Sequence, residues 1–296
     1  MRKSVLLATV LFAVSSSFTL AASPKAKKAK AGSVRVADEC IVIPNSSGTT
    51  SPIALNIAVA SNMWKPMTST ANPVGVVKAF QASDATGATD VPIRVCHNST
   101  GALVEEINKG GSGFDVFLAA NDTAPNEITV SHTSPFDYTK GIPVLWAPNT
   151  SLSLNNGDVA DNPAITMVEV ANPETAPYGA AAKKILGDVQ WQELKEAVPT
   201  RLHINDNIEL TYEAVETAGA TSSTVGFVAK SQICNSPPFS QRNAIAYPAY
   251  ALIQAGTLLP ATPLVLATTF KAWLLTTGSG SAQDILIEGF CYAPLP

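Results

Sequence analysis

Short apolar segments alternate with helix-like segments along most of this chain, and that alternation limits the folds open to it. The apolar segments are bounded by turn residues, as expected for strands buried on both faces of a sheet. We expect strands at 55–60, 93–96, 115–119, 142–147, 165–170, 201–204, 225–229 and 244–251. Helices are expected at 74–82, 101–109, 179–186, 191–197, 207–217 and 265–277. This order predicts an α/β architecture with mainly parallel sheets and right-handed crossovers.

Several of these strands end on a turn that leads into a helix. In IAVASNMW, Ser61 directly follows an apolar strand, which fits either an ordinary helix cap or an anion-binding hydroxyl. In CHNSTGALVEEINKGG, either Ser99 or Thr100 can cap the next helix, which Gly110 and Gly111 end. The pattern therefore recurs at a second junction.

Two later junctions have the same form. ITMVEVANPETAPYG runs into AAAKKIL, and LHINDNIELTYEAVE offers a capping box of Asp206 and Glu209, with Ile208 in the first turn. Each junction presents backbone N–H groups without helical partners at the positive end of a helix dipole. Several such ends meeting at the carboxyl edge of a sheet would bind an anion without Lys or Arg. The recurrence favours a solute-binding protein.

The composition fits an exported globular protein. The chain has 296 residues, 46% hydrophobic and 14% charged, with a formal charge of −4, so it can form one or two packed domains and gives no reason to expect nucleic acid as a partner. Residues 1–22 resemble a secretory signal with a basic start, a short apolar stretch and a small-residue cleavage site. Residues 23–54 read as a basic low-complexity tether and N-terminal extension. We expect a soluble, periplasmic protein.

The four cysteines fit an oxidising compartment. No Cys-x-x-Cys pair occurs, which argues against a zinc site or a thioredoxin-like motif. Three pairings are possible. Cys40 precedes the first expected strand and Cys291 lies near the C-terminus, so we expect a Cys40–Cys291 bond that ties the termini, leaving Cys96–Cys234 by elimination.

The order of these motifs resembles the periplasmic molybdate-binding proteins, components of ABC importers with the type II periplasmic-binding-protein fold. The resemblance runs from about Leu55 to Phe290. IAVASNM is similar to the family's first strand ending in Ala-Ser, and NSTGALVEEINKGGSGFDVFLAAND to its Ser-Ser-Gly helix and the strand that follows. GIPVLWAPNTSL resembles the strand that crosses to the second lobe, ANPETAPYGAAAKKIL the Pro-x-Gly turn, and TVGFVAKSQI a later strand.

The resemblance implies a set of oxyanion ligands. The first serine falls on Ser61 and the second hydroxyl on Thr100, with Ser99 adjacent and also plausible. The backbone N–H donors fall on Tyr178 and Ile208. These residues would hold molybdate or tungstate as cargo, with no cofactor and no catalytic residue.

One position departs from the family. A tyrosine that commonly reaches the oxyanion is replaced by Ala229, and we expect the phenol of Tyr178 to compensate. The loss of a donor from a buried anion site costs roughly 1.5–3 kcal/mol. Ala229 therefore also suggests a rival ligand for the same fold: sulfate, a phosphonate or a small organic anion.

The implied fold has two lobes, each a mainly parallel sheet flanked by helices, with the ligand cleft between them. We expect lobe 1 at 55–140 plus 243–296 and lobe 2 at 141–242. The protein would be a monomer that docks on a membrane permease. An adhesin or accessory protein that kept the fold and lost the ligand is a further alternative.

Other residues suggest different chemistry. Ser61 with a histidine and an acid would make a secreted hydrolase, but the Gly-x-Ser-x-Gly elbow is absent. His97 lies beside Ser99 and Thr100 in the sequence. No second metal-binding residue occurs at the spacing of a metal site, so we interpret His97 as a turn residue. His203 lies on an apolar strand and is expected in the core. We expect a binding protein rather than an enzyme.

Overall fold

The computed structural model describes residues 40–296 except residues 85 and 236. The expected signal peptide at 1–22, and 23–39 of the expected extension, lie outside the described residues. No helix in the described part of the chain is long and apolar enough to cross a membrane.

The first sheet has six strands in the order β1-β3-β2-β4-β11-β5. Its strands are β1 (Cys40–Ile43), β2 (Leu55–Ala60), β3 (Ile93–Asn98), β4 (Val116–Leu118), β5 (Phe136–Gly141) and β11 (Leu252–Leu258). At its centre β2 pairs in parallel with β3 and β4, whereas β1, β11 and β5 pair antiparallel to their neighbours. The carboxyl ends of β2 and β3 therefore lie side by side, with Ala60 opposite Asn98.

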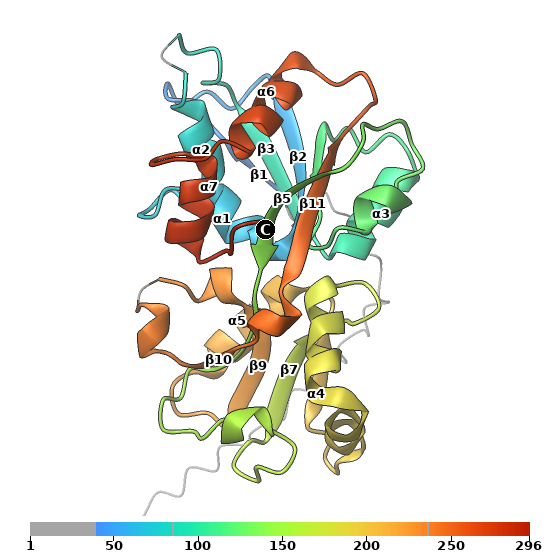
Figure 1. The fold of residues 1–296 in the computed structure, drawn as a ribbon, viewed down its shortest axis with the longest axis vertical. Helices are drawn as coiled ribbons and strands as arrows, with labels where there is room; N and C mark the ends of the chain where they lie inside the picture. The colour runs from blue at the N-terminus through green and yellow to red at the C-terminus, as the bar shows by residue number, and fades with distance from the viewer. Residues whose placement is uncertain (1–39, 85, 236) are drawn as a thin grey trace, which may run out of the picture. The chain divides into compact units, whose positions relative to one another are not determined.

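Helices cover both faces of the first sheet because its strands are apolar on both sides (Figure 1). Alternate residues of β2, Leu55, Ile57 and Val59, belong to one core cluster, while Ala58 and Phe117 belong to another. The helices that pack on the first cluster are α1 (Trp64–Thr68), α2 (Val76–Gln81), α6 (Val265–Leu274) and α7 (Ala282–Asp284). Helix α3 (Thr100–Asn108) packs on the second.

The second sheet has five strands in the order β10-β6-β9-β7-β8. Its strands are β6 (Pro143–Ala147), β7 (Met167–Ala171), β8 (Leu202–Asn205), β9 (Thr224–Ala229) and β10 (Asn243–Ala246). Helix α4 (Pro177–Glu196) packs on one face and α5 (Ile208–Ala218) on the other. A Cβ at Gly226 would lie 2.3 Å from Val215 Cγ2, so the glycine allows α5 to approach β9 closely.

The chain passes from the first sheet to the second between β5 and β6, where only Ile142 separates them. It returns between β10 and β11. Of these crossing strands, β11 runs antiparallel to β4 and β6 antiparallel to β9, whereas β5 and β10 run in the direction of the central strands, so both sheets are mixed. The expected α/β architecture of two sheets flanked by helices is confirmed.

Several elements differ from the sequence-based expectations, and β5 and β11 were not expected at all. Strand β1 lies within the expected extension, because it completes the edge of the first sheet beside β3. Of the expected strand 244–251, only 244–246 form a strand, as part of β10, which pairs with β6 in the second sheet rather than belonging with the first; a 3₁₀ turn follows at Pro248–Tyr250, and β11 begins at Leu252. The two helices expected at 179–186 and 191–197 form the single element α4, interrupted at Gly187 with φ 69°.

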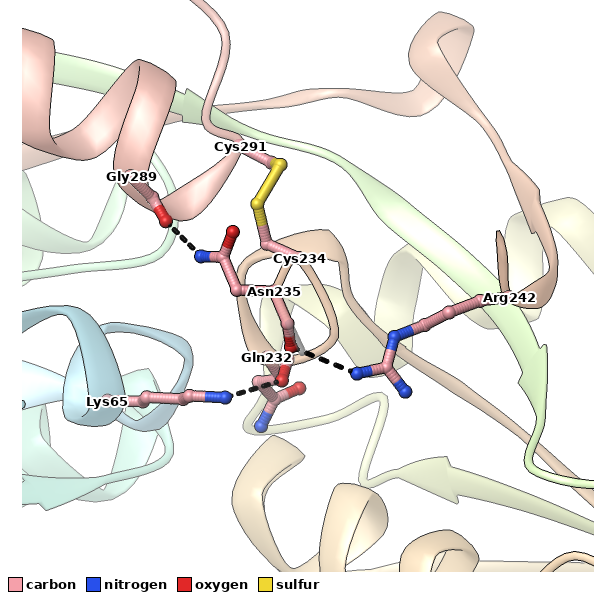
Figure 2. Close-up of a disulfide and its surroundings, with 7 residues drawn as sticks. All are labelled: Lys65, Gln232, Cys234, Asn235, Arg242, Gly289 and Cys291. Atoms are coloured by element: carbon pink, nitrogen blue, oxygen red, sulfur yellow. Dashed lines mark hydrogen bonds between the residues drawn. A yellow bond between two sulfur atoms is a disulfide. The ribbon is translucent and has the colours of Figure 1, made fainter. Parts of the chain in front are cut away.

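The disulfides join Cys40 to Cys96 and Cys234 to Cys291, so the expected pairing is wrong. Cys40 faces Cys96 because β1 lies antiparallel to β3 with these two residues in register. The second bond joins the segment after β9, in the second sheet, to the C-terminal segment, whose Tyr292 belongs to the core of the first sheet (Figure 2). Next to it, the side-chain amide of Asn235 donates to the carbonyl of Gly289.

Candidate functional site

The five residues expected to bind the ligand line one cavity, which we call the central cavity. Ser61, Ser99 and Thr100 follow strands of the first sheet, whereas Tyr178 and Ile208 begin helices beside the second. The full lining is Ala60, Ser61, Asn62, Ser99, Thr100, Ala120, Ala176, Pro177, Tyr178 and Ile208. No charged side chain is among these lining residues. The cavity has about 10 Å³ of room for the centre of a water molecule, about the space that one water needs.

Ser61 lies where β2 ends and the short 3₁₀ turn η2 (Ser61–Met63) begins. Its side chain is 2% exposed, and its Oγ lies 3.2 Å from Nδ1 of His97 at the end of β3. The imidazole stacks on Trp64, with the ring centroids 4.2 Å apart. Burial lowers the pKa of His97 to about 4, so the ring is neutral at pH 7.

Ser99 occupies the N-cap position of α3, but its side chain makes no capping hydrogen bond. The expected cap is therefore absent, and the hydroxyl remains available beside the cavity. Thr100 is buried, and its Oγ1 accepts a hydrogen bond from the backbone N–H of Ala120 at 3.2 Å. That bond uses a lone pair, so the hydroxyl proton of Thr100 is free to be donated elsewhere.

Tyr178 lies in the first turn of α4, which is held close to the end of β7 by Gly179. A Cβ at Gly179 would lie 2.2 Å from the carbonyl oxygen of Ala171, so only glycine allows this approach. The Tyr178 hydroxyl lies beside Gly141, where it accepts from Gln254 Nε2 at 3.2 Å. Its phenol proton is not used by that bond.

Ala229 is fully buried at the end of β9, in the apolar cluster that also contains Tyr178 and Ile208. It is not among the residues that line the central cavity.

The N-terminus of α5 is capped by Asn207 and not by the expected Asp206. Asn207 Oδ1 accepts from the backbone N–H groups of Glu209 and Leu210 at 2.9 and 3.0 Å. The chain enters the helix with Asn207 in an extended conformation and buried, which turns its side chain back onto the first turn. No acceptor for the backbone N–H of Ile208 occurs among the described residues, so this donor is available where the helix meets the cavity.

Asn62 is a cavity residue that the sequence reasoning missed. It is fully buried, and its Nδ2 donates to Gln254 Oε1 at 3.1 Å and to the Tyr292 hydroxyl at 3.0 Å. Its Oδ1 is buried with no donor in the described part of the chain. The only available signal was an amide directly after Ser61 in a stretch that otherwise packs as core.

Polar contacts join the two sides of the cavity. The backbone N–H of Gly101 donates to the carbonyl of Thr175 at 2.8 Å. Ser231 Oγ donates to the carbonyl of Asn62 at 3.2 Å. Lys65 Nζ donates to the carbonyl of Gln232 at 3.2 Å, next to the Cys234–Cys291 bond (Figure 2).

Glu209, one residue beyond Ile208, is a partly buried carboxyl at the same helix end. Burial raises its pKa to about 7, although Gln232 Nε2 donates to its Oε2 at 2.8 Å. Below pH 7 the carboxyl is mostly neutral and therefore adds no full negative charge beside an anion site.

Glu209→Gln is expected to remove a pH dependence of stability. The pKa of Glu209 is about 7 in the folded protein against an ordinary value of 4.5, so its proton stabilises the fold below pH 4.5 and that stability is lost as pH rises towards 7. The loss is at most about 3 kcal/mol. Urea unfolding of both proteins from pH 4 to 8 should show the variant gaining stability relative to the parent as pH rises. Equal pH profiles would contradict this.

His203 is not in the core as expected. Its side chain is 58% exposed, and its Nδ1 lies 2.7 Å from Oε2 of Glu169, to which Asn205 also donates. None of these residues lines the central cavity. Among the described residues, no group of three or more His, Cys, Asp or Glu side chains is placed to hold a metal ion.

Comparison with known proteins gives consistent results. Over 184 residues, 60% of this chain, the sequence is 33% identical to the molybdate-binding protein ModA of Azotobacter vinelandii, of which 66% is covered. It is 29% identical over 180 residues to the molybdate-binding protein ModA of Rhodobacter capsulatus, covering 60% of this chain and 64% of that protein. The chain thus spans just under two thirds of the length of these curated relatives.

Solved structures match over a larger share of the chain. The periplasmic molybdate-binding protein of Azotobacter vinelandii superposes with a TM-score of 0.63 and 20% identity, covering 82% of this chain and 99% of that chain. A substrate-binding protein of an ABC transporter from Agrobacterium tumefaciens gives 0.58 and 12%, covering 86% and 83%. At such identities the likeness establishes the fold, which is that of the type II periplasmic binding proteins.

The family profile described as bacterial extracellular solute-binding protein matches residues 55–287. This range begins with β2 and includes every strand of both sheets except β1. It also contains all the residues that line the central cavity. The chain belongs to the family of bacterial extracellular solute-binding proteins.

Proposed function

We propose that this protein is the substrate-binding component of an ABC importer and that it captures a tetrahedral oxyanion, molybdate or tungstate, in the central cavity. One observation carries the proposal: hydroxyls and helix N-termini from both sheets line a buried cavity that no charged side chain lines. The curated relatives that carry the name molybdate-binding protein support the choice of ligand.

The donors suit an anion that is bound without a positively charged side chain. Ser61, Ser99 and Thr100 offer hydroxyls, and Tyr178 and Ile208 offer backbone N–H groups at the positive ends of α4 and α5. Closure of the two sides over the anion excludes water, which strengthens each of these bonds. The oxyanion is cargo, and binding requires no cofactor.

We further propose that the protein works as a monomer in the periplasm after removal of residues 1–22. The first lobe would be 55–140 plus 243–296 and the second lobe 141–242. Residues 243–246 are moved to the second lobe, because they pair with β6 in the second sheet. In the closed, loaded form it would dock on the membrane permease of the importer.

Asn62 favours a second candidate ligand in the same cavity. Its buried Oδ1 has no donor among the described residues, and a fully ionised dianion would present only acceptors to it. A protonated oxyanion, such as hydrogen phosphate or a phosphonate, would supply the missing hydrogen. Ligand selection therefore needs a direct comparison of these anions.

The Ser61–His97 contact also has the form of a nucleophile and its base, which would suit a hydrolase. A base of that kind is normally oriented by a third group, and none of the hydrogen bonds of the described residues joins a carboxylate to His97. We therefore propose binding rather than hydrolysis. Ester turnover that is lost in Ser61→Ala would reverse this choice.

Thermal unfolding with added anions tests the proposed function. We expect millimolar molybdate and tungstate to raise the unfolding temperature, because a ligand at a thousandfold excess over Kd stabilises the fold by about 4 kcal/mol. Sulfate, phosphate and methylphosphonate are measured separately. The double variant Ser61→Ala, Thr100→Ala is the control and should show no shift with any anion. A shift with phosphate or methylphosphonate alone would replace the ligand, and no shift at all would refute oxyanion binding.

A further inference from the structure

Two of the three cavity hydroxyls that follow strands of the first sheet are each approached by a nitrogen. Ala120 N lies 3.2 Å from Thr100 Oγ1, and His97 Nδ1 lies 3.2 Å from Ser61 Oγ. At Thr100 the direction of the bond is fixed, because a backbone N–H can only donate. The threonine oxygen is therefore the acceptor, and its proton is left for a ligand.

At Ser61 the direction depends on which ring nitrogen of His97 carries the proton. If Nδ1 is bare, the ring accepts a hydrogen bond from the serine hydroxyl, whose lone pairs then face the cavity and would repel an anion. If Nδ1 carries the proton, the ring donates to Ser61 Oγ, and the serine proton points away from the ring. Only a protonated Nδ1 reproduces the arrangement at Thr100, where the hydroxyl oxygen accepts from an N–H and its own proton is left for a ligand.

The fold holds the imidazole in position for this bond. His97 pairs with Val59 in the parallel register of β2 and β3, which places it next to the end of β2. Trp64, at the start of α1, stacks on the ring at 4.2 Å with an interplanar angle of 29°. His97 is only 9% exposed, so little solvent competes for Ser61. His97 itself is not among the residues that line the central cavity.

We propose that His97 is a positioning residue for oxyanion binding: its Nδ1–H donates to Ser61 Oγ and so directs the serine proton into the central cavity. The inference rests on the proposed function for its effect on affinity. It assigns to a side chain at Ser61 the role that the backbone N–H of Ala120 has at Thr100.

The first test compares His97→Phe with His97→Asn by molybdate titration calorimetry. Phenylalanine keeps an aromatic ring against Trp64 and removes the donor, and we expect the affinity to fall about tenfold or more. Asparagine places an amide N–H close to the position of Nδ1, so its affinity should stay within about threefold of the parent. His203→Phe removes a histidine that bonds to Glu169 away from the cavity, and it should bind as the parent does. Parent-like binding by His97→Phe would overturn the proposal.

A double-mutant cycle separates positioning from general damage. In a Ser61→Ala background there is no hydroxyl to orient, so His97→Phe should change the affinity by less than about twofold. If the full loss persists without Ser61, His97 acts by another route and the proposal is wrong.

A second measurement does not depend on the ligand. Long-range ¹H–¹⁵N spectra of the mature protein report which ring nitrogen of His97 is protonated, and we expect Nδ1–H at pH 7. A bare Nδ1 would overturn the proposal even if molybdate binds. If Nδ1 is protonated but the protein binds no oxyanion, the hydrogen bond from His97 to Ser61 stands and the proposed function is refuted.

Discussion

Replacing Cys234 and Cys291 together by serine is expected to lower the free energy of unfolding by about 4 kcal/mol. The bond joins residues 57 apart in sequence, and a cross-link over a loop of that length removes this much loop entropy from the unfolded chain in the entropic account. Urea unfolding of the oxidised parent and the double variant measures the difference. A loss below about 1 kcal/mol would mean that the entropic account does not apply to this bond.

The other disulfide provides a matched control. Cys40 and Cys96 are 56 apart, so their removal should cost nearly the same stability. However, this bond lies between two strands of the first sheet, whereas Cys234–Cys291 joins the second sheet's β9 segment to the C-terminal segment on the first.

Only loss of Cys234–Cys291 should therefore let the two sides of the cavity separate further. Small-angle X-ray scattering of the ligand-free proteins should show a larger radius of gyration for that variant and an unchanged one for the Cys40→Ser, Cys96→Ser control. Equal radii in all three proteins would show that the second disulfide does not restrict opening.

Gly179→Ala is expected to lower oxyanion affinity about 100-fold or more and to cost roughly 1–3 kcal/mol of stability. The added Cβ would lie 2.2 Å from the carbonyl oxygen of Ala171, and a backbone atom cannot move aside as a flexible side chain can. Helix α4 must then withdraw from the end of β7 and carry the N–H of Tyr178 away from the cavity. Molybdate titration and urea unfolding measure the two effects.

Gly187→Ala is the control within the same helix. Gly187 has φ +69°, and no atom of the described residues lies within 4 Å of an added Cβ, so the substitution strains the backbone by roughly 1–3 kcal/mol without crowding a described neighbour. We expect a similar loss of stability with unchanged affinity. If both variants lose affinity equally, reduced stability and not the position of the helix terminus explains the loss.

The sequence predicted the local elements of the site well because each depends on neighbouring residues. The strand expected at 55–60 is β2 (Leu55–Ala60), and the helix expected at 101–109 is α3 (Thr100–Asn108). An apolar run bounded by turn residues is enough to identify a strand that is buried on both faces. The ends of these elements, and therefore the junctions at Ser61 and at Ser99 or Thr100, could be identified on this basis.

Edge and crossing strands were predicted less well. Strand β1 is partly exposed, and the expected strand 244–251 covers the end of β10 and a 3₁₀ turn, stopping just before β11. Such segments owe their conformation to the neighbour with which they pair, which local pattern does not reveal. For the same reason, the register of β1 against β3 decided the disulfide pairing.

Taken alone, the sequence determined that strands lead into helix N-termini at hydroxyl-bearing turns, because capping and apolar periodicity act over a few residues. Only the tertiary structure decided that the five residues expected to bind the ligand meet in one cavity. It also decided that Asn207 caps α5 and that His97 lies against Ser61. Those contacts join residues distant in sequence, and they exist only after strand pairing and the crossings between the sheets bring them together.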